Sequence, residues 1–206
     1  MANVEAGTPP PAGAGREDEG LRAQRTFTAL MRAMAEPGMI EKLEIPAGVP
    51  AALPQGLAAV AVTLADFETP LWLDEQLASA PEVARYLRFA TGAPIVEDPA
   101  RAAFALVSRA TAMPPFTWFS TGSDAYPDRS VTIVTEVQTW AAMQRFELTG
   151  PGIATARSFA AGPLPADFEK RMAENRSLFP RGVDLVITSG DEVMALPRST
   201  CLREIS

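Results

Sequence analysis

Apolar residues recur at helical spacing in four stretches of the chain, which we expect to form helices. These stretches are residues 21–36, 56–63, 81–89 and 165–179. In the first, Leu21, Phe27, Leu30, Met31 and Met34 share one face, which predicts the side that packs on the core. Each of the four is bounded by a proline or a glycine, as helix ends commonly are.

Short runs of apolar and β-branched residues alternate with these helices and predict strands. The expected strands are residues 40–45, 70–73, 102–107, 130–137, 146–148, 183–188 and 192–196. Residues 130–137 (SVTIVTEV) are rich in β-branched side chains, and residues 102–107 (AAFALV) are apolar throughout, as in strands buried on both faces. The alternation predicts an α/β fold, a layered domain with a largely buried central sheet.

The chain of 206 residues divides by composition into a tail and one domain. Residues 1–18 are rich in Pro, Ala and Gly and then acidic, so they cannot bury enough apolar surface to offset the entropy of ordering. We therefore expect a disordered tail over residues 1–18 and a single α/β domain over residues 19–206. No internal repeat and no secretory signal pattern is recognisable.

The chain has no histidine, one cysteine (Cys201) and two lysines (Lys42 and Lys170). Without histidine it cannot build a Ser-His-Asp or Cys-His site, or a His-ligated zinc site, from its own residues. One cysteine cannot supply the ligands of an iron–sulfur cluster. A pyridoxal enzyme needs a Schiff-base lysine, and both lysines stand in charged, solvent-facing patterns. The composition therefore favours a binding or assembly subunit that has no cofactor and no metal.

The charge and hydropathy of the chain indicate which kinds of partner it can bind. The net charge of −7, with arginines spread along the chain and no basic run, argues against nucleic acid. The longest apolar-rich stretch, residues 57–64, is far shorter than the ~20 residues of a membrane-spanning helix. The lone cysteine suits a reducing compartment, so we expect a cytoplasmic protein.

With histidine absent, carboxylates are the main candidates for catalytic or metal-binding groups. Two pairs of acidic residues lie in sequences typical of turns. They are Asp66 with Glu68, and Asp124 with Asp128. Oxygen ligands of this kind can hold Mg²⁺, so a Mg-dependent enzyme acting on a phosphorylated or nucleotide substrate is the alternative function. The structural alternative is that an aspartate in a turn accepts a hydrogen bond from the backbone two residues on. Phosphate-binding glycine motifs are absent from the sequence.

Two arginines flank predicted strands and are candidates for binding a ligand or a partner. Arg129 precedes residues 130–137, and Arg198 follows residues 192–196. Either guanidinium could hold a phosphate or carboxylate through two hydrogen bonds, although the more common outcome is a partly exposed ion pair with an aspartate. The tryptophans Trp72, Trp118 and Trp140 are typical of a core or a subunit interface.

Seven sequence motifs, in order along the chain, resemble the H subunit family of the carbon–phosphorus lyase complex (PhnH). They are FTALMRAMAEPG (27–38), ETPLWL (68–73), FATGAP (89–94), YPDRSVTIV (126–134), LTGPGI (148–153), FPRGVDLVI (179–187) and ALPRST (195–200). Each motif is weak alone, but seven in register span nearly all of the chain outside the tail.

The resemblance implies a role in bacterial phosphonate breakdown, as one subunit of a core complex with the G, I and J subunits. It implies a three-layer fold similar to the large domain of pyridoxal-phosphate-dependent transferases but without their cofactor site. It also implies a homodimer in isolation, and it brings no catalytic residue to this chain. We therefore expect a non-catalytic assembly subunit needed for coupling a phosphonate to a nucleoside triphosphate.

Overall fold

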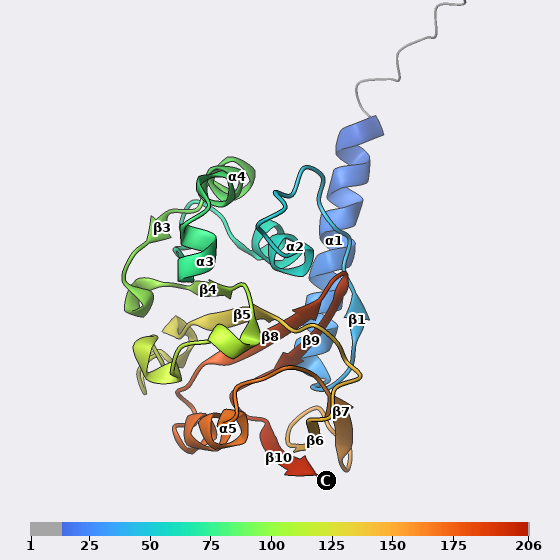
Figure 1. Cartoon of the computed structure of the whole chain (residues 1–206), viewed down its shortest axis with the longest axis vertical. Coiled ribbons are helices and arrows are strands. Elements are labelled where there is room, and N and C mark those ends of the chain that lie inside the picture. The colour runs from blue at the N-terminus through green and yellow to red at the C-terminus, as the bar shows by residue number, and fades with distance from the viewer. Residues whose placement is uncertain (1–13, 206) are drawn as a thin grey trace, which may run out of the picture.

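The computed structural model describes residues 14–205 and has an α/β fold around a mixed seven-stranded sheet (Figure 1). The strand order is β1-β9-β8-β5-β4-β2-β3. The bounds are β1 Glu41–Lys42, β2 Leu71–Leu73, β3 Ile95–Val96, β4 Phe104–Val107, β5 Thr132–Glu136, β8 Asp184–Ser189 and β9 Glu192–Leu196. Neighbouring strands from β3 to β8 run parallel, whereas β9 is antiparallel to both β8 and β1.

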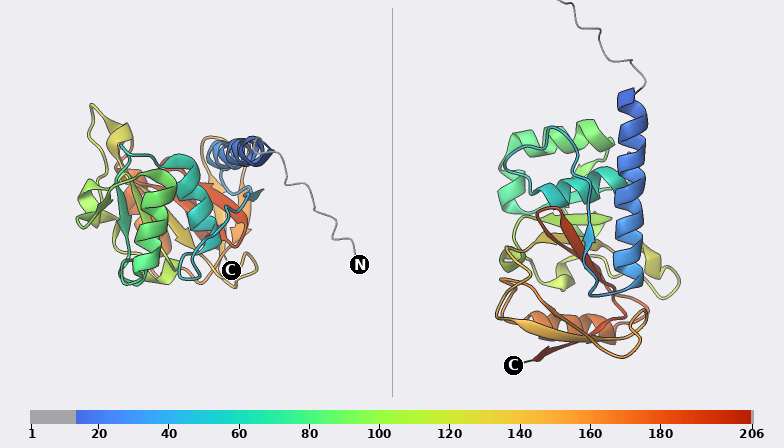
Figure 2. Two further views of the ribbon diagram at one scale, coloured as in Figure 1. Left: turned by 90° about the horizontal axis from the view of Figure 1, so that it is seen from above. Right: turned by 90° about the vertical axis from the view of Figure 1, so that its right-hand side faces the viewer.

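Four helices cover one face of this sheet (Figures 1 and 2). They are α1 Ala14–Ala35, α2 Gln55–Leu64, α3 Glu75–Ala78 and α4 Pro81–Thr91. Leu57 of α2 and Leu87 of α4 are fully buried and share a core with Leu106 and Val134 of the sheet. Gly56 permits the close approach of α2, because a Cβ there would lie 2.5 Å from the Cβ of Thr188 on β8.

The opposite face carries a second layer of mixed structure. It consists of α5 Phe168–Ser177 and a three-stranded antiparallel sheet in the order β10-β6-β7, with bounds Cys201–Ile205, Arg145–Thr149 and Arg157–Ala160. The 3₁₀ turns η2 Ala110–Ala112 and η3 Phe116–Trp118 lie on this side too, while η1 Pro99–Arg101 precedes β4. Phe146 of β6 connects the small sheet of this layer to α5, since its ring stacks on Phe159 of β7 at 5.3 Å and meets Phe168 of α5 edge-on at 5.8 Å.

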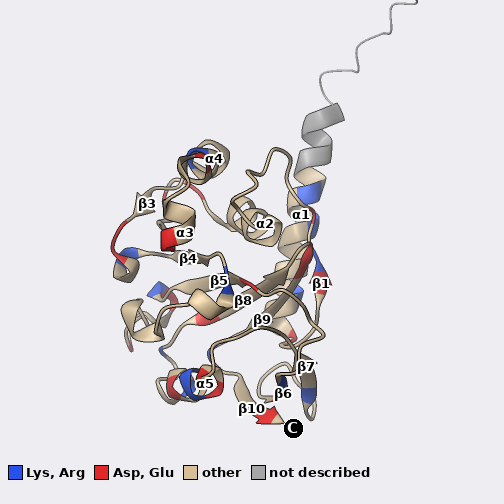
Figure 3. Cartoon of the chain, in the orientation of Figure 1, with Lys and Arg blue, Asp and Glu red and all other residues tan. Residues whose placement is uncertain are grey.

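The central strands are buried on both sides because their side chains are apolar on both sides. In β8, Leu185 and Ile187 face the layer of α5, whereas Val186 faces the layer of α2. Figure 3 shows that charged residues gather on the outer helices and at the strand ends, and that the middle of the sheet is almost free of them. The α/β class predicted from alternating helices and apolar strands is confirmed.

The first helix differs from its prediction in both its start and its buried face. It begins at Ala14, so residues 14–18, predicted to belong to the tail, form its first turns. Glu and Arg, which dominate residues 16–19, have a high helix propensity. Residues 1–13, the rest of the predicted tail, lie outside the described residues.

The buried face of α1 consists of small and branched residues rather than the largest ones. Thr26, Ala29, Leu30 and Ala33 face the sheet, as expected for positions three and four apart. Phe27 and Met31, predicted to face the core, are 48% and 43% exposed. The helix packs closely over β9, where small side chains fit.

The remaining differences concern short elements at the edges. The sequence reading missed α3, β3, β7 and β10, and it overestimated the length of β1, which pairs with β9 over two residues. Residues 165–167 precede α5, which begins at Phe168 rather than at the proline. No helix among residues 14–205 is both long enough and apolar enough to span a bilayer.

Candidate functional site

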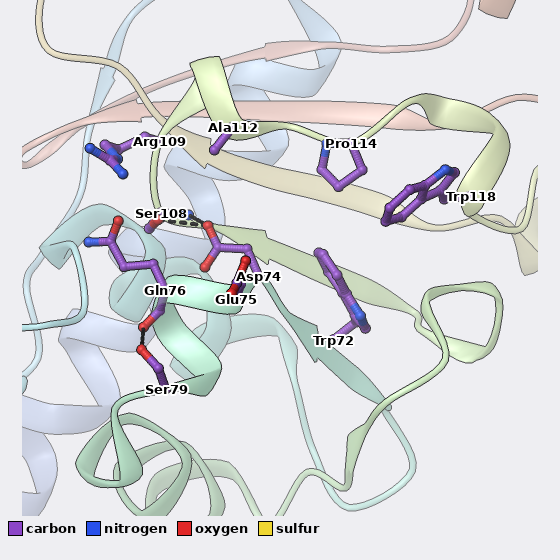
Figure 4. Close-up of a pocket in the computed structure, with 10 residues that line it drawn as sticks. All are labelled: Trp72, Asp74, Glu75, Gln76, Ser79, Ser108, Arg109, Ala112, Pro114 and Trp118. Carbon is purple, nitrogen blue, oxygen red and sulfur yellow. Dashed lines mark hydrogen bonds between the residues drawn. The ribbon is translucent and has the colours of Figure 1, made fainter.

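A crevice of about 600 Å³ opens at the carboxyl ends of β2 and β4 (Figure 4). After β2 the chain enters α3 and α4 on one face of the sheet, and after β4 it enters η2 and η3 on the other face. The two neighbouring strands therefore send their connections in opposite directions and leave a gap between them. Open α/β sheets commonly bind ligands at such a point, where the winding of the chain reverses.

Asp74 forms the floor of this crevice and connects its two sides. It directly follows β2 and is 6% exposed. Its Oδ1 accepts a hydrogen bond from the backbone N–H of Leu77 at 2.9 Å, which caps α3. Its Oδ2 accepts from the backbone N–H of Ser108 at 2.7 Å and from the Ser108 hydroxyl at 2.6 Å. Both carboxylate oxygens are thus engaged, and Asp74 holds the segments after β2 and β4 together.

The walls of the crevice are aromatic and its rim is charged. Trp72 lies on one wall, packed edge-on against Phe119 at 5.5 Å, and Trp118 of η3 lies across from it beside Pro114 (Figure 4). Arg109 stands on the rim next to Ser108. Its guanidinium forms no ion pair or hydrogen bond with any part of the chain that the structure describes.

The candidate Arg198 lies at the opposite edge of the sheet, where β5 and β8 begin. Its guanidinium pairs with Asp184, with Nε 3.1 Å from Oδ1 and a further close contact between Nη2 and Oδ2. It also donates to the carbonyl of Pro127 at 2.6 Å and to the hydroxyl of Ser130 at 2.5 Å. Both charged side chains are about 15% exposed (15% and 14%). Arg198 therefore forms the intramolecular ion pair that was one of its two predicted roles.

The other candidates near this edge are exposed and loosely held. Arg129, in η4 (Pro127–Arg129), places its guanidinium 4.2 Å above the ring of Tyr126. Asp124 forms an ion pair with Arg181 at 3.1 Å and is largely in solvent. Asp128 is the central residue of η4 and is also exposed.

The acidic pair Asp66 and Glu68 lies in the loop between α2 and β2. Asp66 Oδ1 accepts from the backbone N–H of Glu68 at 2.9 Å and from the Thr69 hydroxyl at 2.7 Å. The Thr69 hydrogen bond, followed by that from Glu68, lowers the pKa of Asp66 below its usual value. This is the backbone turn that the sequence offered as the structural alternative to a metal ligand. Among the side chains that the structure describes, those of residues 20–205, no three of His, Cys, Asp or Glu come together as a metal ligand set.

Both lysines are engaged with carboxylates on the surface. Lys42 pairs with Asp191 at 3.0 Å and with Glu192 at 3.3 Å, and the Asp191 hydrogen bond raises the pKa of Lys42. Lys170 lies 3.8 Å from Glu174, one turn along α5. Neither amine is desolvated, which is the condition that activates a Schiff-base lysine.

Sequence reasoning missed the crevice residues Asp74, Ser108 and Arg109. A signal was available, because Asp74 directly follows the apolar run PLWL and Ser108-Arg109 directly follow AAFALV. Polar residues at the carboxyl ends of adjacent parallel strands are where ligand-binding side chains are expected. The adjacency of β2 and β4 was the missing fact, since β3 separates them in the sequence.

The sequence of the chain matches a protein-family model and two curated relatives. Residues 14–203 match the family model described as bacterial phosphonate metabolism protein (PhnH). A protein of Rhizobium meliloti (strain 1021), named alpha-D-ribose 1-methylphosphonate 5-triphosphate synthase subunit PhnH, is 40% identical over 185 residues, which cover 90% of this chain and 92% of that protein. The chain therefore belongs to the PhnH family, as its seven motifs predicted.

A second, shorter similarity points the same way. A Stutzerimonas stutzeri protein named putative C-P lyase subunit protein HtxG is 35% identical over 79 residues, which cover 38% of this chain and 40% of that protein. Both relatives carry the word subunit in their names.

Proposed function

We propose that this chain is a subunit of the carbon–phosphorus lyase core complex, required where a phosphonate is coupled to a nucleoside triphosphate. The observation that carries the proposal is the 40% identity to the Rhizobium synthase subunit over nine-tenths of the chain. The family match over residues 14–203 supports a role in phosphonate metabolism independently of that one relative.

Within the complex, the chain acts through assembly and positioning rather than through bond making. The absence of histidine and the single cysteine in the sequence support this role. The engagement of Asp66 in a turn and of Arg198 in an internal ion pair supports it further, because both candidates are occupied with their own chain. The likeness to the large domain of pyridoxal-phosphate-dependent transferases, without their cofactor site, remains a prediction of the resemblance.

The proposed partners are a second copy of the chain and the G, I and J subunits, in the cytoplasm. Exposed apolar side chains suit such contacts, and they include Phe27 and Met31 on α1 and Phe89 on α4, which is 91% exposed. Light scattering of the purified chain should give about twice the monomer mass of 21.9 kDa at micromolar concentration. A monomer mass would contradict the homodimer.

Growth on a phosphonate tests the function itself. A host strain whose gene for this chain has been deleted should fail to grow with methylphosphonate as sole phosphorus source and should grow normally on phosphate. A plasmid copy of the full chain should restore growth on methylphosphonate. Undiminished growth of the deletion strain on methylphosphonate would refute the proposal.

A further inference from the structure

We propose that the crevice between β2 and β4 binds a nucleotide with a single phosphate or phosphonate group. The base would lie against the tryptophans, the sugar near Glu75, and the anionic group at Arg109. This inference goes beyond membership of the complex and stands on the crevice alone.

The volume and position of the crevice fit a small organic ligand. Its volume of about 600 Å³ lies within the range of known small-molecule pockets. It also lies at the point in the parallel sheet where the connections diverge to opposite faces, which is the usual ligand position in open α/β sheets.

The floor of the crevice is preformed by hydrogen bonds within the chain. Asp74 accepts three hydrogen bonds, two of them from Ser108, and so fixes the start of α3 against the residues after β4. Arg109 and Glu75 are the residues next to this junction in sequence. Their backbones are therefore held by a buried carboxylate, while their side chains remain exposed at the crevice.

Arg109 is the group that would hold the anion. Its guanidinium has no ion-pair or hydrogen-bond partner among the residues that the structure describes, whereas Arg171 and Arg198 each bind carbonyl and carboxylate oxygens of the chain. A free guanidinium beside a crevice offers a planar set of donors that matches a phosphate or phosphonate group.

The tryptophans would hold a flat ring. Trp72 and Trp118 come from different elements and face the crevice from opposite sides, and Trp118 is 55% exposed (Figure 4). An indole exposed at a pocket offers a π-face on which a nucleobase stacks without demanding a particular base.

The charge balance of the lining sets how many anionic groups the ligand carries. The lining contains one cation, Arg109, and two acids, Asp74 and Glu75. A triphosphate would bring more negative charge to this lining, whose formal charge is −1, than a single phosphate group, which carries about −1.5 to −2 at pH 7 and lies beside one arginine. Glu75 is exposed and lines the crevice, and its carboxylate oxygens are acceptors that suit the hydroxyl donors of a sugar.

Titration calorimetry of the full chain with AMP, adenosine, ATP and inorganic phosphate tests the proposal. AMP should bind more tightly than adenosine, phosphate or ATP. Arg109→Ala should weaken AMP binding about 10–100-fold and leave adenosine binding nearly unchanged. Trp118→Ala should weaken AMP and adenosine alike, by about 5–150-fold. Arg85→Ala, which removes an exposed arginine on α4 outside the crevice, is the matched control.

Each other outcome overturns the proposal. Absence of binding at millimolar AMP would refute the site. If phosphate binds as tightly as AMP, and Trp118→Ala leaves AMP binding unchanged, then the proposed stacking of the base on the tryptophans is wrong. Equal weakening by Arg109→Ala and Arg85→Ala would refute the role of Arg109. The variants change exposed residues, and circular dichroism melting curves that match the wild type would show that the fold is intact. Absence of AMP binding by an unmodified chain that restores growth on methylphosphonate would refute this inference and leave the proposed function standing.

Discussion

Replacement of Arg198 by alanine should destabilise the chain severely, although this arginine was first a candidate for binding a ligand. Arg198 lies where β5 and β8 begin and contacts two separate segments, through Asp184 of β8 and through Ser130 and the carbonyl of Pro127 at the ends of η4. Removal of its side chain leaves Asp184 as a mostly buried carboxylate without its cation, and leaves the Pro127 carbonyl without this donor.

The magnitude follows from the burial of the pair. Breaking a buried ion pair by removing one partner typically costs about 3–5 kcal/mol, because the remaining charge stays in a poorly solvated place. The two side chains here are 15% and 14% exposed, so the pair is not completely buried. We therefore expect a loss in the lower part of that range. A domain of this size loses roughly 2–4 °C in Tm per kcal/mol, so a loss of about 3–4 kcal/mol lowers the Tm by roughly 6–16 °C.

Arg203 provides the matched control. It pairs with Glu147 at 2.7 Å, but the two side chains are 69% and 33% exposed. Arg203→Ala should therefore cost less than about 1 kcal/mol. Thermal melts and urea titrations of both variants measure the difference. If Arg198→Ala melts within a degree or two of the wild type while phosphonate turnover in the assembled complex is abolished, the structural role assigned to Arg198 is wrong.

Three further predictions concern other parts of the fold. Asp74→Ala leaves two buried N–H donors without an acceptor and should cost about 2–5 kcal/mol in urea unfolding, whereas Ser108→Ala should cost only about 1–2. Gly152→Ala should cost at least ~2 kcal/mol in the same assay, since φ is +81° and the new Cβ would lie 2.1 Å from the carbonyl oxygen of Ala35. The lowered pKa of Asp66 means that its carboxylate stabilises the fold fully above the unfolded pKa of about 4, and that this contribution is lost as pH falls through the lower folded value. Melting curves of wild type and Asp66→Asn should therefore differ at neutral pH and converge in acid, and a constant gap would contradict the pKa shift.

The central strands were predictable because their runs of apolar residues indicate burial on both faces. Residues 102–107 and 183–188 are apolar almost throughout, and only a strand covered on both faces tolerates that pattern. β3 was not predictable, since its two residues, Ile95 and Val96, carry no periodicity. On α1, Thr26 and Ala33 face the core and Phe27 does not, because the space above β9 selects for small side chains.

The candidate site was harder to predict than the fold, for a topological reason. The sequence shows that Asp74 and Ser108 each follow an apolar strand, but 33 residues and β3 lie between them. Only the strand order brings them within 2.7 Å of each other. By contrast, the turn at Asp66 was predictable in detail, because its hydrogen bonds run to residues two and three positions on.

Co-expression of this chain with the G, I and J subunits, followed by mass measurement of the purified assembly, tests the proposed function most directly. An affinity tag on a subunit other than this one should retain the chain through gel filtration, at a fixed ratio to its partners. The measured mass should then include the 21.9 kDa chain in that whole-number ratio. An assembly of the other subunits that forms at full yield and never contains this chain would contradict its role as a subunit.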